Sequence, residues 1–338
     1  MSMIDERFKK QRAVFFISCS PFQVMCMIEV IKTFELEDYK VLLCYDEKEL
    51  PRKKQTLALL EQYNIKYEIE SFNYRITKGD RLRMMKPVYN GVKLAFIGNC
   101  CDELLIYKAT RYVSNGGTLI YFDDGTATIQ FFNGLFQLSD KLRSYYNLVC
   151  KLRNLDFDKY FFTIYKGLKD GKHICLDNKF TYFVSQQMNK AEKKDIILLG
   201  VYSDRFCEEE QIGPAIFVKK LREYIVQLKQ TYPEERIIYV PHGKDTFQEP
   251  KQICEELEIM YQPSEISVEM LLLDALNRPR AVYGFTSSAL YNVKMLFPDT
   301  EVYNVTFTGN TPLNDRVENA SRYYEKHGIT RVVLDINK

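Results

Sequence analysis

Short apolar runs of β type alternate with longer amphipathic stretches along most of the chain, and this pattern occurs twice. In the first half, strands are predicted at 13–18, 39–45, 66–72, 103–108 and 117–123, with helical patterns at 23–34 and 53–64. This alternation is typical of βαβ units, in which helices connect parallel strands. It predicts a doubly wound α/β domain.

The pattern restarts after a less regular, Tyr-, Phe- and Lys-rich stretch at 127–190. Strands are predicted at 195–201, 236–242, 281–288, 301–307 and 331–336, with helices at 214–231, 267–277, from 288, and at 314–327. A chain of 338 residues is long enough for two cores. We therefore predict two domains, 1–188 and 189–338.

Two such domains predict a cleft lined by the carboxyl ends of both sheets. The chain contains no G-x-G-x-x-G after the first strand and no G-x-x-x-x-G-K-[ST], so a Rossmann dinucleotide site and a P-loop are not supported. The net charge of +2 gives no electrostatic reason to expect a nucleic-acid partner.

The nine cysteines include no C-x-x-C pair, and the first ten residues lack the apolar core of a signal peptide. No apolar run approaches the roughly 18 residues that span a bilayer. These features predict a reducing, cytoplasmic location. The basic run 78–86 leaves peripheral association with the inner membrane open, although a solvated face is the simpler interpretation. A homodimer also stays open.

Polar groups follow three of the predicted strands, at the ends where open α/β sheets bind ligands. These stretches, FDDG, VPHG and GFTSS, supply Asp123, Asp124, Gly125, His242, Gly243, Thr286, Ser287 and Ser288. Turns explain acidic residues followed by glycine, and helix capping explains the serines. A carboxylate facing imidazole and hydroxyl groups across a cleft also suits a group-transfer reaction.

The hydroxyl pair has a clear physical use. A helix N-terminus presents unpaired N–H groups and the positive end of the helix dipole, so with Ser287 and Ser288 it forms an anion site that fits phosphate. At the first helix, Ser20 is a natural N-cap and Pro21 suits the first helical position. Gln23 completes a capping box or lines the cleft. Glu265, just before a predicted helix, either binds donor or is simply solvated.

The order of these motifs resembles the bacterial sialyltransferases. The series runs from [ST]-P-x-Q at the first helix, through an acidic pair with glycine and a histidine beside proline, to a Ser-Ser pair. It is most similar to glycosyltransferase family 52, the lipooligosaccharide α-2,3-sialyltransferases. That motif usually reads His-Pro, whereas here Pro241 precedes His242, which leaves the aim of the imidazole open.

The resemblance implies a GT-B fold that needs no metal or other cofactor, with an N-terminal acceptor domain and a C-terminal CMP-sialic acid domain. One of Asp123 and Asp124 would be the general base, His242 would meet the donor phosphate, and Ser287 and Ser288 would hold it. Successive strand residues point to opposite faces, so only one acid can face the cleft. We prefer Asp123 as the base and Asp124 as the structural residue.

The predicted reaction is therefore an inverting transfer of sialic acid from CMP-sialic acid to a galactoside or sialoside of lipooligosaccharide or capsule. Two enzyme alternatives keep the scaffold: a transferase for another nucleotide sugar, and a pyruvyl transferase that uses phosphoenolpyruvate. A third alternative is a polysaccharide-binding protein with a decayed site. The candidate acceptor segments, 72–93 and 125–180, contain no pattern that identifies the acceptor.

Overall fold

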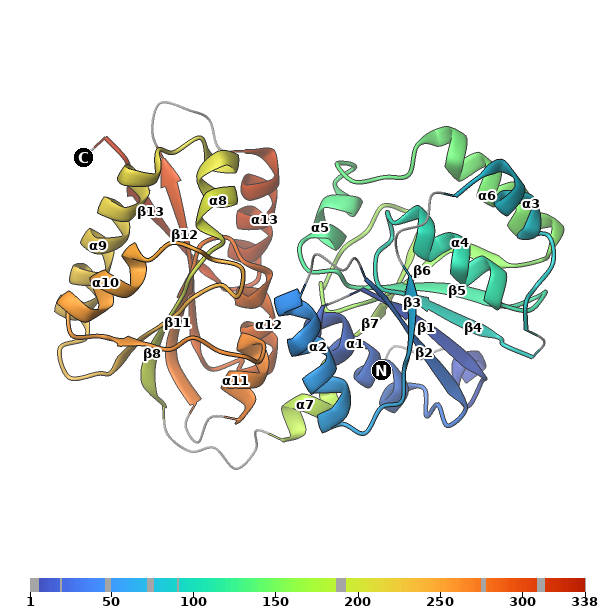
Figure 1. The fold of residues 1–338 in the computed structure, drawn as a ribbon, viewed down its shortest axis with the longest axis horizontal. Helices are drawn as coiled ribbons and strands as arrows, with labels where there is room; N and C mark the ends of the chain where they lie inside the picture. The colour runs from blue at the N-terminus through green and yellow to red at the C-terminus, as the bar shows by residue number, and fades with distance from the viewer. Residues whose placement is uncertain are drawn as a thin grey trace. The chain divides into compact units, whose positions relative to one another are not determined.

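The computed structural model describes residues 6–18, 20–45, 50–71, 76–89, 91–186, 193–274, 278–308 and 314–337. The chain forms two compact units, Met1–Tyr182 and Phe183–Lys338. Each unit has its own sheet with helices packed against it (Figure 1). The domain boundary expected at 188 and 189 and the residues 72–75 of a candidate acceptor segment lie outside the described residues.

The N-terminal unit contains a seven-stranded parallel sheet in the order β3-β2-β1-β4-β5-β6-β7. Its strands are β1 (Ala13–Ile17), β2 (Tyr39–Tyr45), β3 (Glu68–Ser71), β4 (Leu94–Ile97), β5 (Thr118–Phe122), β6 (Asp156–Thr163) and β7 (Ile174–Asp177). Its helices are the short 3-10 turn Glu6–Phe8, α1 (Pro21–Thr33), α2 (Leu50–Gln62), α3 (Lys78–Arg83), α4 (Glu103–Tyr112), α5 (Ala127–Phe132) and α6 (Asp140–Leu152). Helix α7 (Thr181–Ser185) spans the division between the units.

The C-terminal unit contains a six-stranded parallel sheet in the order β10-β9-β8-β11-β12-β13. Its strands are β8 (Lys193–Leu199), β9 (Ile237–Val240), β10 (Met260–Tyr261), β11 (Arg278–Gly284), β12 (Glu301–Thr308) and β13 (Thr330–Asp335). Its helices are α8 (Ser203–Glu210), α9 (Pro214–Thr231), α10 (Glu249–Glu256), α11 (Val268–Asp274), α12 (Ser288–Leu296) and α13 (Asp315–Lys326). Both units thus have the 3-2-1-4-5-6 order of doubly wound folds, and the predicted class is confirmed.

Central strands are buried on both faces, as expected for parallel sheets covered by helices. Every residue of β1, β4, β5 and β9 is buried. On one face of the first sheet, Phe15 stacks on Phe96 with ring centroids 4.8 Å apart, and Phe34 of the segment after α1 packs over Phe96. This rigid core fixes the strand ends from which the polar groups project.

The prediction of a strand at 103–108 is wrong, because these residues begin helix α4. Asp102 caps the helix, since its carboxylate accepts hydrogen bonds from the N–H groups of Leu104 and Leu105 at 2.8 and 3.1 Å. The strand that occupies this place in the sheet is β4, which sequence reasoning missed because only four residues, Leu94–Ile97, are extended. The unpredicted segment Gly98–Asp102 therefore lies at the carboxyl edge of the sheet.

The described part of the stretch 127–190, expected to be irregular, contains three helices, α5, α6 and α7, and two strands, β6 and β7, that extend the first sheet. Strand β6 was not predicted, because its first half is polar and half-exposed and only Tyr160–Thr163 is buried. Helices α8 and α10 of the second unit were also not predicted. The predicted helix 214–231 is confirmed with Pro214 in its first turn.

No helix within the described ranges is long and apolar enough to cross a membrane.

Candidate active site

The carboxyl edge of the first sheet is organised by one buried amide, Gln23 on α1. Its Oε1 accepts hydrogen bonds from the N–H and hydroxyl of Ser18, at 2.8 and 3.0 Å. Its Nε2 donates to the carbonyl oxygen of Gly98 at 2.7 Å and to Asp124 Oδ1 at 2.8 Å. Gln23 therefore joins the ends of β1, β4 and β5, which the register of the parallel strands places side by side.

Asp124 is half-buried, and two amides orient its carboxylate. Gln23 binds Oδ1, and Asn99 Nδ2 donates to Oδ2 at 2.9 Å. Asn99 is itself fixed, because its Oδ1 accepts a hydrogen bond from the Cys101 N–H at 2.9 Å. Donors to both oxygens stabilise the charged carboxylate and set its direction, while its partial exposure leaves it open to a substrate.

Asp123 points the other way and is completely buried. Its Oδ1 accepts a hydrogen bond from the Thr163 hydroxyl and its Oδ2 from the Ile164 N–H, both at 2.7 Å. Burial raises the pKa of Asp123 to about 7, against the opposing effect of these hydrogen bonds. A pKa near neutrality suits a general base, but a carboxylate with no exposed surface cannot reach an acceptor hydroxyl. Asp123 instead ties the end of β5 to the end of β6.

The two acids thus have opposite orientations, as expected from strand alternation, but the preference for Asp123 as the base disagrees with its burial. The half-exposed Asp124 is the acid that can meet a substrate. Asp124 is therefore the better candidate for a base, whereas Asp123 connects the ends of β5 and β6. Gly125 follows with a φ of 59°, a left-handed conformation that glycine adopts without strain and that turns the chain into α5.

The first helix begins as predicted, although its capping differs. Ser20 occupies the N-cap position and Pro21 the first turn, but the Ser20 side chain makes no capping hydrogen bond. Gln23 does not form a capping box and instead orients Asp124. Asn99 is the residue of this edge that sequence reasoning missed, because the short strand before it was not recognised. A polar residue after the apolar run 94–97 was the available signal.

Replacing Gln23 by alanine would remove the four hydrogen bonds that its side chain makes at this edge of the sheet. We expect Gln23→Ala to lower the free energy of unfolding by about 1–3 kcal/mol, because Ser18, Gly98 and Asp124 each lose a hydrogen bond. Denaturant unfolding measures this change. Glu61→Ala, an exposed substitution on α2, serves as a surface control and should change stability little. Equal stability of wild type and Gln23→Ala would contradict the role of Gln23.

His242 follows β9 at the carboxyl edge of the second sheet and is half-exposed. Its Nδ1 accepts a hydrogen bond from the Lys244 N–H at 3.1 Å, and the ring lies near Tyr202, with centroids 6.3 Å apart and planes inclined by 16°. Because a neutral imidazole that accepts at Nδ1 carries its proton on Nε2, the local structure selects a tautomer whose Nε2–H is a donor. Gly243 is exposed within the same turn.

The turn after β11 carries the hydroxyl groups. Thr286 has a left-handed φ of 43°, and its N–H donates to Asn304 Oδ1 at 2.8 Å. Ser287 caps α12, with its hydroxyl oxygen accepting from the Ala289 N–H at 3.3 Å, and Ser288 begins the nine-residue helix. All three residues are half-exposed. The predicted combination of hydroxyls with a helix N-terminus is therefore present. Two N–H groups of the first turn already bind Ser287, because Ala289 donates to its hydroxyl and Leu290 to its carbonyl oxygen, at 3.3 and 3.1 Å.

Glu265 lies in the segment before α11 and is exposed. The register aligns Leu199 of β8 with Val240 of β9 and with Gly284 of β11. His242 and the turn at Thr286–Ser288 thus follow strands on either side of β8, at one edge of the sheet. Glu265 follows β10, the strand beyond β9, so its donor-binding role stays a prediction.

The sequence model of the alpha-2,8-polysialyltransferase family (POLYST) matches residues 113–306, more than half of the chain. The chain belongs to this family. It is therefore a glycosyltransferase of a sialyltransferase family, and the predicted class of enzyme is confirmed. The narrower expectation of glycosyltransferase family 52 is not confirmed. No curated protein sequence matches the chain significantly.

Solved structures share the fold at low sequence identity. The 2,6-sialyltransferase of Photobacterium sp. JT-ISH-224, solved with CMP and lactose, aligns with a TM-score of 0.54 and 12% identity over 96% of this chain and 78% of that chain. UGT89C1 of Arabidopsis thaliana, complexed with UDP-L-rhamnose, aligns with a TM-score of 0.50 and 12% identity over 98% and 86% of the two chains. MnaA of S. aureus with UDP aligns with a TM-score of 0.50 and 10% identity over 93% and 88%. These similarities support the predicted GT-B fold.

Proposed function

We propose that this enzyme transfers sialic acid from CMP-sialic acid to the 8-hydroxyl of a sialoside acceptor. The family match supports the sialyl donor and the α-2,8 linkage. The structural neighbour solved with CMP and lactose supports a CMP-linked donor and a glycan acceptor. The observation that carries the proposal is Asp124, a half-buried carboxylate held by two amides at the carboxyl edge of a GT-B domain.

Each unit supplies one half of the proposed chemistry. In the N-terminal, acceptor-binding unit, Asp124 takes the proton from the acceptor hydroxyl as its oxygen attacks the anomeric carbon of sialic acid. The bond from that carbon to the phosphate oxygen breaks, and its electron pair stays on CMP. In the C-terminal, donor-binding unit, His242, Ser287 and Ser288 stabilise the developing phosphate charge. A single displacement inverts the anomeric configuration.

The direct test incubates the enzyme with CMP-sialic acid and a panel of sialosides and galactosides. Mass spectrometry identifies the product, and NMR assigns the linkage and anomeric configuration. An α-2,8-linked product on a sialoside is expected. Transfer to galactosides alone would overturn the acceptor, and products formed only from another nucleotide sugar or phosphoenolpyruvate would overturn the donor.

Ligand-induced stabilisation distinguishes the donors independently of turnover. We compare the melting temperature with CMP, UDP, GDP and phosphoenolpyruvate, because a ligand that binds the folded state raises it by mass action. A shift with CMP alone is expected. The sialyltransferase family match gives no support to the alternatives of a pyruvyl transferase or a non-catalytic polysaccharide-binding protein.

The proposed reaction needs no divalent cation, so activity should persist in excess EDTA. The groups proposed to meet the phosphate are the imidazole of His242, the hydroxyls of Ser287 and Ser288, and the N-terminus of α12. The sequence contains one D-x-D pair, Asp156 and Asp158, the arrangement that binds metal in some glycosyltransferases. Here both carboxylates contact basic side chains: Asp158 contacts Arg143 and His173, and Asp156 contacts Lys159. Initial rates with EDTA, and with added Mg²⁺ or Mn²⁺, should agree within about twofold. Strict dependence on an added cation would overturn this prediction.

A further inference from the structure

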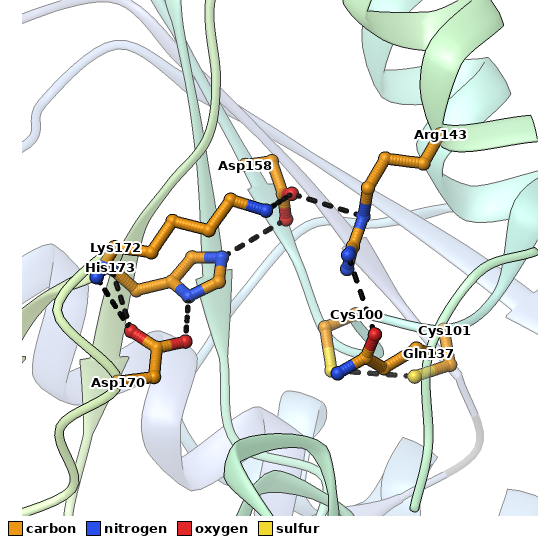
Figure 2. Close-up of polar contacts among 8 residues, drawn as sticks. All are labelled: Cys100, Cys101, Gln137, Arg143, Asp158, Asp170, Lys172 and His173. Carbon is orange, nitrogen blue, oxygen red and sulfur yellow. Dashed lines mark hydrogen bonds and ion pairs between the residues drawn. The ribbon is translucent and has the colours of Figure 1, made fainter. Parts of the chain in front are cut away.

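A second group of charged side chains lies in the N-terminal unit, outside the hydrogen bonds that hold Asp124 (Figure 2). Asp158 of β6 is at its centre, with a side chain only 8% exposed. Its Oδ2 lies 3.4 Å from Arg143 Nε and 3.7 Å from Lys172 Nζ, and its Oδ1 lies 3.3 Å from His173 Nε2. His173 Nδ1 lies 2.5 Å from Asp170. We call these five residues the cationic cluster.

The backbone aims Asp158 into this cluster. The β5–β6 pairing is irregular between Thr118 and Ile120, whose partners are Asp156 and Tyr160, so β6 bulges at this point. Asp158 within the bulge has a left-handed φ of 52°. Bulges redirect side chains, and left-handed conformations of non-glycine residues occur preferentially at functional sites.

The cluster brings three basic side chains together with two carboxylates. Burial lowers the pKa of His173, but hydrogen bonds from its ring to the carboxylates of Asp158 and Asp170 outweigh this and raise the pKa overall. The raised pKa favours the protonated imidazole, which carries a positive charge like those of Arg143 and Lys172. Asp158 shares its charge among three cations and therefore does not neutralise Arg143 alone.

The terminal nitrogens of the Arg143 guanidinium do not bind Asp158, which contacts Nε. Asp158 faces Nε, the inner nitrogen, at 3.4 Å, which is too long for a strong ionic hydrogen bond. Within the described part of the chain, the terminal nitrogen Nη1 donates a long hydrogen bond of 3.4 Å to Oε1 of Gln137, and Gln137 is exposed. The two terminal N–H groups form the fork that binds carboxylates in bidentate fashion.

Arg143 and Asp124 share a common neighbour, Cys101. The Cys100 thiol contributes most to the lowered pKa of the Cys101 thiol, and burial opposes it. The nearby Arg143 guanidinium lowers this pKa further, whereas the Asp124 carboxylate raises it. The Cys101 N–H also binds Asn99, which in turn binds Asp124. Arg143 lies in the first turn of α6, with its guanidinium end near the Cys100–Cys101 pair (Figure 2).

We propose that Arg143 forms a carboxylate-binding site beside Asp124 that recognises the carboxylate of a sialylated acceptor. This inference rests on the proposed function, because a sialoside carries its carboxylate and its 8-hydroxyl on the same sugar residue. Asp124 meets the hydroxyl, while the terminal edge of Arg143 replaces Gln137 with the carboxylate. A neutral galactoside has no group for this site, so Arg143 determines acceptor specificity and takes no part in proton transfer.

Equilibrium binding without donor tests this site independently of turnover. The probes are an α-2,8-linked sialic acid trimer and lactose, titrated into wild type, Arg143→Gln, Arg143→Lys and Lys141→Gln. Lys141 lies exposed in the same first turn of α6, so it controls for loss of one positive charge. We expect Arg143→Gln to weaken trimer binding by at least about 10-fold, because charge-assisted hydrogen bonds are lost. Arg143→Lys should bind the trimer more tightly than Arg143→Gln but less tightly than wild type, and Lys141→Gln should change the trimer affinity little.

Folding defects are separated by comparing the two probes within each variant. The ratio of trimer to lactose affinity does not depend on the fraction of folded protein, and thermal melting reports stability separately. A fall in this ratio for Arg143→Gln alone supports the site, even if the enzyme were to use a different donor. An unchanged ratio, or an equal fall for Lys141→Gln, overturns it. Absence of sialyl transfer by wild type would instead count against the proposed function.

Discussion

Asp124→Asn should lower kcat by about 10²-fold or more, the typical contribution of a positioned general base. Asparagine keeps the shape of the side chain but cannot accept the acceptor proton. The KM for CMP-sialic acid should change little, because the donor is proposed to bind the C-terminal unit. Initial rates at saturating acceptor, together with CMP binding by calorimetry, measure both quantities.

The hydrogen bonds of Asp124 make a structural side effect predictable. Gln23 and Asn99 each donate to one carboxylate oxygen, so the amide nitrogen of an asparagine would face one of these donors. We expect a loss of about 1–3 kcal/mol in unfolding free energy as well. Asp124→Ala removes that conflict, and rescue of its rate by added formate would show that the missing group is a base, because a structural defect does not respond to a small carboxylate.

Asp123→Asn is the matched control. Burial raises the pKa of Asp123 to about 7, so near neutral pH the protonated and ionised forms are both populated, and asparagine resembles the protonated form. Turnover should stay within several-fold of wild type, with any defect appearing in thermal stability. If Asp123→Asn instead abolishes turnover while Asp124→Asn does not, the two roles are exchanged. Normal turnover in both variants would remove the acidic pair from the mechanism.

The sequence was most informative about the fold, because its pattern of strands and helices extends over whole domains. Both doubly wound domains follow from the alternation of apolar runs and amphipathic stretches, and most strands were placed within a few residues. The exceptions have local causes. The run at 103–108 has the apolar residues typical of a strand. It forms a helix whose N-terminus is stabilised by Asp102, because the Asp102 carboxylate accepts hydrogen bonds from two N–H groups of the first turn. Strand β4 has four residues, too few for a clear period.

The site shows the same division. The motif order made Asp124, His242 and the serine pair candidates for the proposed site, because their residue types and their positions near strand ends can be read from the sequence. The choice between Asp123 and Asp124 cannot be read from the sequence. It depends on which acid faces β6, where Thr163 donates a hydrogen bond to Asp123. Asn99 and Arg143 gain their importance from neighbours distant in sequence. A helix Arg carries no such signal, and that of Asn99, a polar residue after the apolar run 94–97, is weak.

His242 carries the other large expected effect. If its Nε2–H stabilises the departing phosphate, His242→Asn should lower kcat by about 10²- to 10³-fold, as the loss of a preorganised donor does elsewhere. Asparagine is chosen because its side-chain oxygen can replace Nδ1 in accepting the Lys244 N–H, which preserves the turn. His242→Gln extends an N–H farther out and should recover part of the rate.

Two comparisons separate leaving-group stabilisation from a general disturbance. Hydrolysis of CMP-sialic acid in the absence of acceptor should fall by a similar factor in His242→Asn, because departure of CMP is common to hydrolysis and transfer. His327→Asn is the matched histidine control: His327 lies at the end of α13, where its Nδ1 is 2.8 Å from the Tyr323 carbonyl oxygen and its ring stacks on Tyr323, so kcat should be unchanged. Near-normal hydrolysis and transfer by His242→Asn would exclude the imidazole from leaving-group stabilisation and leave the phosphate to Ser287, Ser288 and the N-terminus of α12.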